Sequence, residues 1–313
     1  MRAPDMKTVT LTLSAAYDVH AYAAALIPDH ENLAEITDED AGGKGVNISR
    51  ALARVGAENR AVVVLGEENC DRFEKMLKDD GINYISIRTP GRIRENLTLH
   101  TASGKETRIS FKGAPAPEDL MDRVEEICAE ICDADTVLTV TGRVPDGIDT
   151  SSVCAFAKRM KESGVRVVID SRSFSLDDLM ECKPFLIKPN SEEICTYMKR
   201  DITSVGDALS AARELCALGI ENVMISLGKD GAVLANSSGA WHVAAPDAAV
   251  VSTVGAGDSS IAGFLFALSC GEDWQGCLRH AVAFGSAACM TRGTRPPKPE
   301  DIRKFIEDQP EDR

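Results

Sequence analysis

From Pro117 onward, the chain alternates between two apolar patterns. Short continuous apolar runs predict buried strands, and apolar residues three or four positions apart predict helices. The predicted strands are residues 136–140, 165–169, 223–227 and a run that ends at Lys188, and the predicted helices are residues 120–131, 153–160 and 205–218. Strands that alternate with helices in this way predict a parallel sheet with helices on both faces.

Residues 93–111 have a different pattern. Short alternating runs lie on both sides of the Ser-Gly pair at 103–104, which is typical of a β-hairpin. With the weakly periodic and polar residues 19–40, they predict a small β-sheet outside the main core. Arg94 and Arg108 lie in this segment. Charged residues on edge strands commonly prevent aggregation, and the alternative is that these arginines bind an anion.

A further strand is predicted at Thr8–Leu13, and Asp18 follows it closely. Binding crevices of parallel sheets form at the carboxyl ends of their strands, so an aspartate just past a strand end is a candidate ligand-binding residue. Aspartate is also a common turn former. Both interpretations of Asp18 stay open.

Composition narrows the class of protein. The 313 residues carry a formal net charge of −14, which argues against nucleic acid or an anionic membrane surface as a partner. The ten cysteines contain no Cys-x-x-Cys pair and fall mostly among apolar helical positions, so we expect free thiols in a reducing compartment. The first residues lack the apolar segment of a signal peptide, and no apolar run has the length of a membrane span. We therefore expect a cytoplasmic protein.

Residues 251–259 read Val-Ser-Thr-Val-Gly-Ala-Gly-Asp-Ser, and helical spacing follows as far as Gly271. Glycines let backbone amides converge at the start of a helix, where the macrodipole favours an anion such as phosphate. Asp258 either complements the dipole, or it is a general base that takes a proton from a hydroxyl while the amides hold a transferring phosphoryl group.

A second glycine turn, residues 41–47, also precedes helical spacing. It is not a Walker A loop, because Lys44 is followed by Gly45 rather than by serine or threonine. The alternative to an anion site is a flexible loop with a solvated lysine.

The two turns together resemble the two signatures of the ribokinase-like PfkB sugar kinases. They are Gly-Gly-Lys-Gly-Val-Asn at 42–47 and Thr-Val-Gly-Ala-Gly-Asp-Ser at 253–259, and the likeness extends over nearly the whole chain, closest to the phosphosugar branch of the 1-phosphofructokinases. This resemblance implies a single catalytic domain over residues 1–313, with a three-layer α/β/α sandwich, a mostly parallel central sheet and a small β-sheet lid at about residues 15–40 and 90–112. It also implies ATP and Mg²⁺ as cofactors.

The resemblance assigns roles to individual residues. Catalysis falls to Asp258 as base and to Gly255, Ala256 and Gly257, which with Asp258 form an anion hole. The sugar phosphate would contact Asp18, Gly43, Asn47, Lys44, Arg94 and Arg108, and Arg143 is a further candidate because it stands where a serine of the family would face the sugar. The nucleotide would contact Lys188, Asn190, Ser226, Gly228 and Gly231, and Asn190 and Glu193 would act on Mg²⁺ through water.

Three departures from the branch pattern concern the substrate. Ser14-Ala15 replaces an Asn-Pro pair, Arg143 replaces a serine, and Arg108 is basic, as in some 6-phosphofructokinases. The expected reaction is phosphorylation of fructose 1-phosphate to fructose 1,6-bisphosphate. The alternatives are a tagatose-6-phosphate kinase or 6-phosphofructokinase, another sugar or nucleoside kinase of the family, and a non-catalytic sugar-binding relative. Because exposed lid strands often pair between subunits, we also expect a homodimer through the lid.

Overall fold

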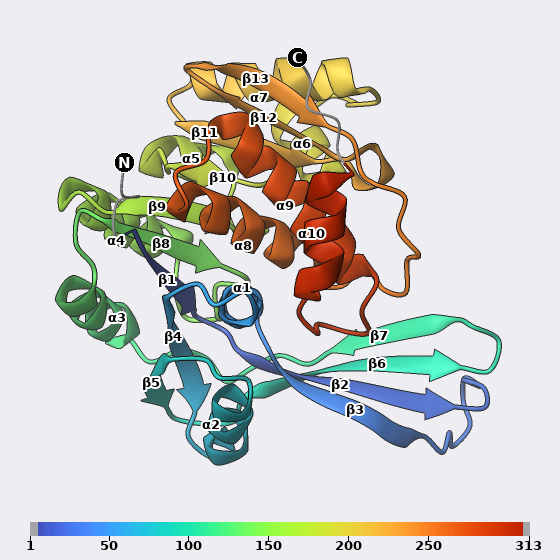
Figure 1. Ribbon diagram of the computed structural model, residues 1–313. Coiled ribbons are helices and arrows are strands. Elements are labelled where there is room, and N and C mark those ends of the chain that lie inside the picture. Colours follow the sequence, from blue (N-terminus) through green and yellow to red (C-terminus); the bar gives the residue numbers. More distant parts are fainter. Residues whose placement is uncertain (1–5, 309–313) are drawn as a thin grey trace.

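The computed structural model describes residues 6–308, which form two β-sheets and the helices that pack on them (Figure 1). The main sheet has the order β13-β12-β11-β10-β9-β8-β1-β4-β5. Its neighbouring strands are parallel except for the pairs β11–β12 and β12–β13. The strands are β1 (Lys7–Thr12), β4 (Asn59–Gly66), β5 (Tyr84–Thr89), β8 (Thr136–Thr141), β9 (Arg166–Asp170), β10 (Leu186–Ile187), β11 (Asn222–Ser226), β12 (Ala232–Asn236) and β13 (Gly239–Val243).

Helices cover both faces of this sheet, which confirms the predicted three-layer sandwich. One face carries α3 (Leu120–Ile131), α4 (Thr150–Glu162), α5 (Leu176–Cys182), α6 (Ser191–Met198) and α7 (Val205–Ala217). The other face carries α1 (Lys44–Arg54), α2 (Cys70–Asp79), α8 (Ala256–Ser269), α9 (Trp274–Cys289) and α10 (Pro299–Glu307). The sequence did not predict α5 and α6, because seven and eight residues are too short for a clear helical repeat.

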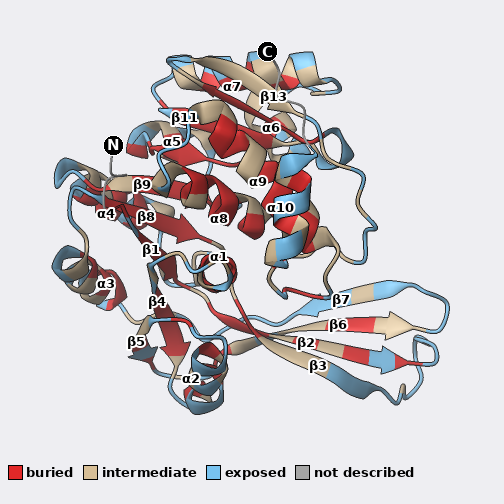
Figure 2. Cartoon of the chain, in the orientation of Figure 1, coloured by how far each residue is buried: buried red, intermediate tan, exposed pale blue. Residues whose placement is uncertain are grey.

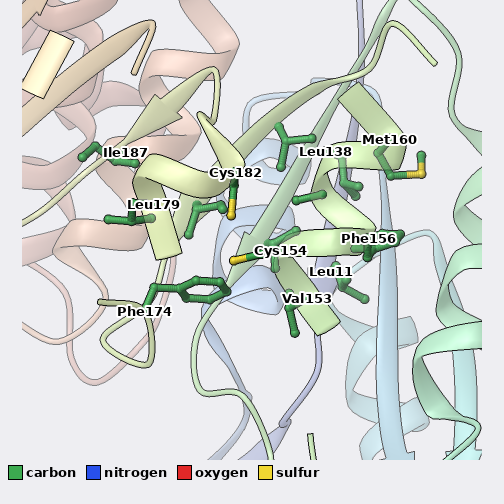
Figure 3. Close-up of a cluster of buried hydrophobic side chains, with 14 of the residues drawn as sticks. Leu11, Leu138, Val153, Cys154, Phe156, Met160, Phe174, Leu179, Cys182 and Ile187 are labelled. Carbon is green, nitrogen blue, oxygen red and sulfur yellow. The ribbon is translucent and has the colours of Figure 1, made fainter. Parts of the chain in front are cut away.

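Side chains of the strands alternate between the two cores. On β4, Val62 and Val64 pack on the side of α3 and α4, whereas Val63 and Leu65 pack on the side of α2. Figure 3 shows the first core, where Phe156 is fully buried. Burying a side chain of this size stabilises the fold by about 1.5–3 kcal/mol.

The cysteines follow the prediction of free thiols. All ten are unpaired, and only Cys270 among them is classed as exposed. Cys154 and Cys182 are members of the core in Figure 3 and pack there as small apolar residues. Within residues 6–308, no helix is long and apolar enough to cross a membrane.

The small sheet has the order β3-β2-β6-β7 and extends away from the main sheet (Figure 1). Its strands are β2 (Ala16–Ala23), β3 (Glu35–Gly42), β6 (Arg94–Thr101) and β7 (Glu106–Ser110). Figure 2 shows that the main sheet is largely buried, whereas the outer part of β3 and most of β7 are exposed. The prediction that Asp18 lies in a turn past a strand end is wrong. The chain bends at residues 13–14 and continues as β2, which contains Asp18.

Candidate active site

Helices α1 and α8 begin at the two glycine turns and pack against each other. Gly43 and Gly255 precede them with φ of 124° and 78°, a conformation that favours glycine. Close approach to β1 also requires glycine, because a Cβ atom on Gly45 would lie 2.4 Å from Thr12 Oγ1. The first amides of a helix have no acceptor in a preceding turn, so both helices offer unpaired N–H groups where they begin, although the Ala256 amide donates to the Thr253 carbonyl oxygen at 3.4 Å.

Asp258 lies in the first turn of α8 and is 6% exposed. Asn47 of α1 donates from Nδ2 to Asp258 Oδ2 at 2.8 Å. Burial raises the pKa of Asp258 to about 6, although Lys44 and the hydrogen bond from Asn47 favour the carboxylate. A carboxyl group with this pKa is ionised at neutral pH and remains basic enough to accept a proton from a hydroxyl.

Asp170, the last residue of β9, is the centre of a buried ion cluster. Lys44 Nζ donates to its Oδ2 at 2.8 Å, and Lys188 Nζ lies 3.7 Å from its Oδ1. Burial alone would raise the pKa of Asp170, but the two ammonium groups lower it below its ordinary value. No role was predicted for Asp170, although its place at the end of a predicted strand is a signal that could have identified it.

The two lysines of this cluster lie close to the helix starts. Burial would lower the pKa of Lys44, but the carboxylates of Asp170 and Asp258 raise it above its ordinary value. A Cβ atom on Gly257 would lie 3.0 Å from Lys188 Nζ, so this ammonium group lies beside the first turn of α8. Unpaired amides and two cations therefore surround the place where an anion would bind.

A second group of polar side chains lies where the small sheet leaves the main sheet. Asn96 donates from Nδ2 to Asp18 Oδ1 at 2.8 Å, and Arg94 donates from Nη1 to Asn96 Oδ1 at 2.6 Å. Arg94 Nε also donates to Ser14 Oγ at 3.1 Å. A Cβ atom on Gly42 would lie 2.2 Å from Asp18 Oδ2, so Asp18 lies against the turn before α1. Asn96 was not predicted as a site residue. The only indication in the sequence was that it lies two residues after Arg94 on a predicted strand, so that both side chains share one face.

Among residues 6–308, no carboxylate forms an ion pair with Arg94. Burial lowers the pKa of Arg94, with Asp18 opposing and the charge of Arg143 adding to this effect. Arg143 follows Gly142, which lies beside the Lys44 side chain, and it pairs with Asp146 Oδ1 at 3.0 Å. Arg108 is exposed on β7, paired in register with Thr98 two residues farther out than Asn96.

Asn190 and Glu193 form a capping box at the start of α6. Asn190 Oδ1 accepts from the Glu193 amide at 2.9 Å, and Glu193 Oε2 accepts from the Asn190 amide at 2.9 Å. Glu193 Oε1 also accepts from Arg172 Nε at 2.8 Å. No group of three metal-binding side chains exists in the described part of the chain. The amide and carboxylate oxygens of Asn190 and Glu193 are donors of the kind that Mg²⁺ takes, an ion that keeps several waters and uses few protein ligands.

The remaining predicted nucleotide residues lie after β10 and β11. Asn190 forms an isolated bridge with Ser226, which places the two strand ends side by side. Gly228 begins the short 3-10 helix Gly228–Asp230 with φ of 60°. Packing accounts for Gly231, because a Cβ atom there would lie 1.9 Å from the Val243 carbonyl oxygen.

Comparisons with known proteins identify the family of this chain. A model of the pfkB family of carbohydrate kinases matches residues 6–301. The chain is 31% identical over 283 residues to 1-phosphofructokinase of Escherichia coli strain K12, which covers 90% of each chain. It is 28% identical over 303 residues to ATP-dependent 6-phosphofructokinase isozyme 2 of the same strain, which covers 96% of this chain and 98% of that one.

Solved structures agree as well. Phosphofructokinase-2 from Escherichia coli in complex with potassium superposes with a TM-score of 0.90 at 28% identity, over 96% of this chain and 98% of that one. Ribokinase from Thermotoga maritima superposes with a TM-score of 0.79 at 21% identity, over 97% of this chain and 100% of that one, and so shares the fold. The resemblance inferred from the two glycine turns is confirmed: the chain belongs to the pfkB family of carbohydrate kinases and is an ATP-dependent sugar kinase.

Proposed function

We propose that this enzyme transfers the γ-phosphoryl group of ATP to a hydroxyl of a ketohexose monophosphate, with fructose 1-phosphate as substrate and fructose 1,6-bisphosphate as product. The observation that carries the proposal is Arg94, a half-buried guanidinium that forms no ion pair among residues 6–308 and whose hydrogen-bond partners Ser14 and Asn96 are neutral. A buried charge is costly unless an opposite charge compensates it. The substrate's own phosphate supplies that charge, and the planar guanidinium suits phosphate oxygens.

The sugar lies between Arg94 and Asp258 in this proposal. Asp18 binds sugar hydroxyls, because Asn96 already fixes one of its oxygens and the other lies against the Gly42 turn. The Gly43 backbone and Asn47 complete this part of the site. Lys44 is bound to Asp170, so it acts on the transferring phosphoryl group rather than on the phosphate that the substrate brings.

Phosphoryl transfer requires alignment, charge neutralisation and a base. Asp258 accepts the proton of the attacking hydroxyl, and the amides of Ala256, Gly257 and Asp258 hold the charge on the transferring group. Lys188 lies beside Gly257 and adds positive charge there. Mg²⁺ bound near Asn190 and Glu193 through water would neutralise nucleotide phosphate charge. Ser226, Gly228 and Gly231 lie along the nucleotide side of the site.

An assay of ADP release tests the proposal. The panel contains fructose 1-phosphate, fructose 6-phosphate, tagatose 6-phosphate, unphosphorylated fructose and adenosine. We expect kcat/KM for fructose 1-phosphate to exceed that for fructose by about 100-fold or more, since a charge-assisted contact to phosphate is lost. A kcat/KM for fructose or adenosine equal to that for fructose 1-phosphate would contradict the assignment of a sugar phosphate as substrate. Binding of sugar phosphates without any ADP release would favour a non-catalytic relative.

Fructose 6-phosphate is the second candidate substrate. Arg143 and Arg108 favour it, because they add positive charge where the 1-phosphofructokinase pattern has none, and the charge of Arg143 reaches Arg94. The variant Arg143→Ser separates the two candidates. We expect it to change the ratio of kcat/KM between the two substrates by about tenfold, as for one charged contact. Unchanged Michaelis constants for every sugar phosphate would remove Arg143 from the substrate site.

The apolar face of the small sheet supports a homodimer. Ile36 pairs in register with Ala21, and Ile109 with Leu97, on the face opposite Asp18. Ile36 is 65% and Ile109 43% exposed, and paired subunits would bury both. Light scattering of Ile109→Asp should then give a monomer where the parent chain gives a dimer. The free thiols and the family fit a cytoplasmic enzyme.

A further inference from the structure

A chain of buried hydrogen bonds leads from Asp258 away from the sugar site. Arg50 lies three residues after Asn47 on α1 and is 4% exposed. Its Nη1 donates to Asn47 Oδ1 at 3.0 Å, and Asn47 Nδ2 donates to Asp258 Oδ2 at 2.8 Å. The proposed catalytic carboxylate is therefore connected through one amide to a buried guanidinium.

The guanidinium determines which end of the Asn47 amide faces Asp258. An asparagine side chain has an acceptor end and a donor end, whereas arginine can only donate. Arg50 therefore binds the oxygen end of Asn47 and leaves the NH₂ end for the carboxylate. With the amide turned over, two oxygens would face each other at Asp258, and Arg50 would face an NH₂ group that cannot accept its proton.

Arg50 is itself held on two other sides. Its Nη2 donates to the Ala41 carbonyl oxygen at 2.5 Å, at the end of β3 just before the glycine turn. Its Nε donates to Asp80 Oδ2 at 2.7 Å, and Asp80 caps the C-terminus of α2. The Asp80 side chain is 36% exposed, whereas that of Arg50 is 5% exposed. The position of Asn47 thus depends on three elements, α1, β3 and α2.

We propose that Arg50, held by Asp80, is a positioning residue for phosphoryl transfer, because it orients the Asn47 amide so that this amide holds the catalytic carboxylate of Asp258. This inference rests on the proposed role of Asp258 as the base. Arg50 touches neither substrate nor nucleotide in this scheme. The alternative is that Arg50 only ties α1 to β3 and α2, in which case its loss lowers stability without a specific effect on proton transfer.

The pH profile of kcat distinguishes the two roles. The groups that face Asp258 are Asn47, Lys44, Lys188 and Asp170, and the hydrogen bond from Asn47 lowers the pKa of Asp258. If the amide is no longer held, that bond weakens, and the acid limb of the kcat profile moves to higher pH. A purely structural role leaves the position of this limb unchanged.

The first variant is Arg50→Met. We expect kcat to fall about 10- to 100-fold, as for one hydrogen bond to a charged group, with the KM for ATP unchanged and the acid limb shifted upward. Because Arg50→Met leaves buried acceptors unsatisfied, Asp80→Ala is made in parallel at a half-exposed position. It should move kcat and the acid limb in the same direction by a smaller amount. Asp79→Ala is the matched control, since the neighbouring Asp79 pairs with Lys75 on the surface, and it should leave both quantities unchanged.

A double-variant cycle tests whether Arg50 acts through Asn47. In an Asn47→Ala background, Arg50→Met should cause little further loss of kcat, because the amide that it orients is gone. The inference would be overturned if the losses of kcat from Asn47→Ala and Arg50→Met were additive. It would also be overturned if Asp80→Ala and a folded Arg50→Met both kept the kcat and the pH profile of the parent chain. Comparison with Asp258→Asn separates the two claims. Turnover retained in Asp258→Asn contradicts the base itself, whereas an inactive Asp258→Asn beside normal Arg50 and Asp80 variants contradicts only the positioning role.

Discussion

The carboxyl end of the main sheet and the base of the small sheet differ in whether their charged side chains have partners within the protein. In the main sheet, Asp170 lies between Lys44 and Lys188, and Asp258 accepts from Asn47. Each charge there has a partner within the protein. On the small sheet, Arg94 donates hydrogen bonds only to neutral groups, and Asp18 acts on its charge without forming an ion pair. The charged side chains of the first region are thus held within the protein before any ligand binds, whereas Arg94 has no ion-pair partner among residues 6–308.

This difference separates the residues proposed for phosphoryl transfer from those proposed to select the substrate. Groups that already hold one another need little rearrangement when the phosphoryl group arrives, which is the arrangement that electrostatic catalysis requires. An arginine without an ion-pair partner instead favours a substrate that brings its own negative charge. In the proposed mechanism, the reaction type thus depends on the carboxyl end of the main sheet, and the choice of substrate depends on the base of the small sheet.

The largest expected effect concerns the main sheet. Replacement Asp258→Asn removes the proton acceptor but keeps the shape of the side chain, so kcat should fall by about 10²- to 10⁴-fold, the usual contribution of a general base. The KM for the sugar phosphate should change little, since Arg94 remains. The measurement is steady-state ADP release. Asp273→Asn, at the N-cap of α9, is the control, because asparagine caps a helix as well as aspartate. Near-normal turnover in Asp258→Asn would remove the distinction between the two regions.

A smaller effect is expected on the small sheet. Arg94→Met should raise the KM for the sugar phosphate by about 10- to 100-fold, because the phosphate loses a charge-assisted partner. The KM for ATP and the turnover of unphosphorylated fructose should stay constant. Arg88→Met is a matched control on β5, where Arg88 pairs with Glu74 away from the site. An equal rise in the KM for fructose would mean that Arg94 supports the fold of the site rather than binding phosphate.

The sequence allowed prediction of the main sheet more fully than of the small sheet. Continuous apolar runs predicted the strands of the core, and apolar residues three or four positions apart predicted its helices. The two glycine turns predicted the starts of α1 and α8. Asp170 and Asn96 were missed because each depends on a contact between segments far apart in sequence, Asp170 with Lys44 and Asn96 with Asp18. Asp18 was misplaced because a bend at residues 13–14 looks the same in sequence as the end of a strand.

The smallest effect is on stability, and it has opposite signs at the two buried aspartates. The folded-state pKa of Asp258 is raised from 3.8 to about 6, so the folded protein favours the protonated form. That contribution is fully present below pH 3.8 and is lost as the pH rises through about 6. Asparagine resembles the protonated form, so at pH 7 the free energy of unfolding of Asp258→Asn should exceed that of the parent chain by roughly 1–3 kcal/mol. The variant should therefore unfold at a higher temperature. The difference should shrink as the pH is lowered from about 6 toward 4.

Asp170→Asn serves as the contrast. The pKa of Asp170 is lowered in the folded protein, so its ionised form stabilises the fold at neutral pH, and its replacement should lower the melting temperature. Thermal unfolding of both variants from about pH 4 to 8 provides the measurement. If Asp258→Asn lowered the melting temperature as Asp170→Asn does, Asp258 would be a structural ion-pair partner. A carboxylate that weakens the fold where it lies is instead what a base held in a desolvated site requires, because the same burial that costs stability keeps the group ready to take a proton.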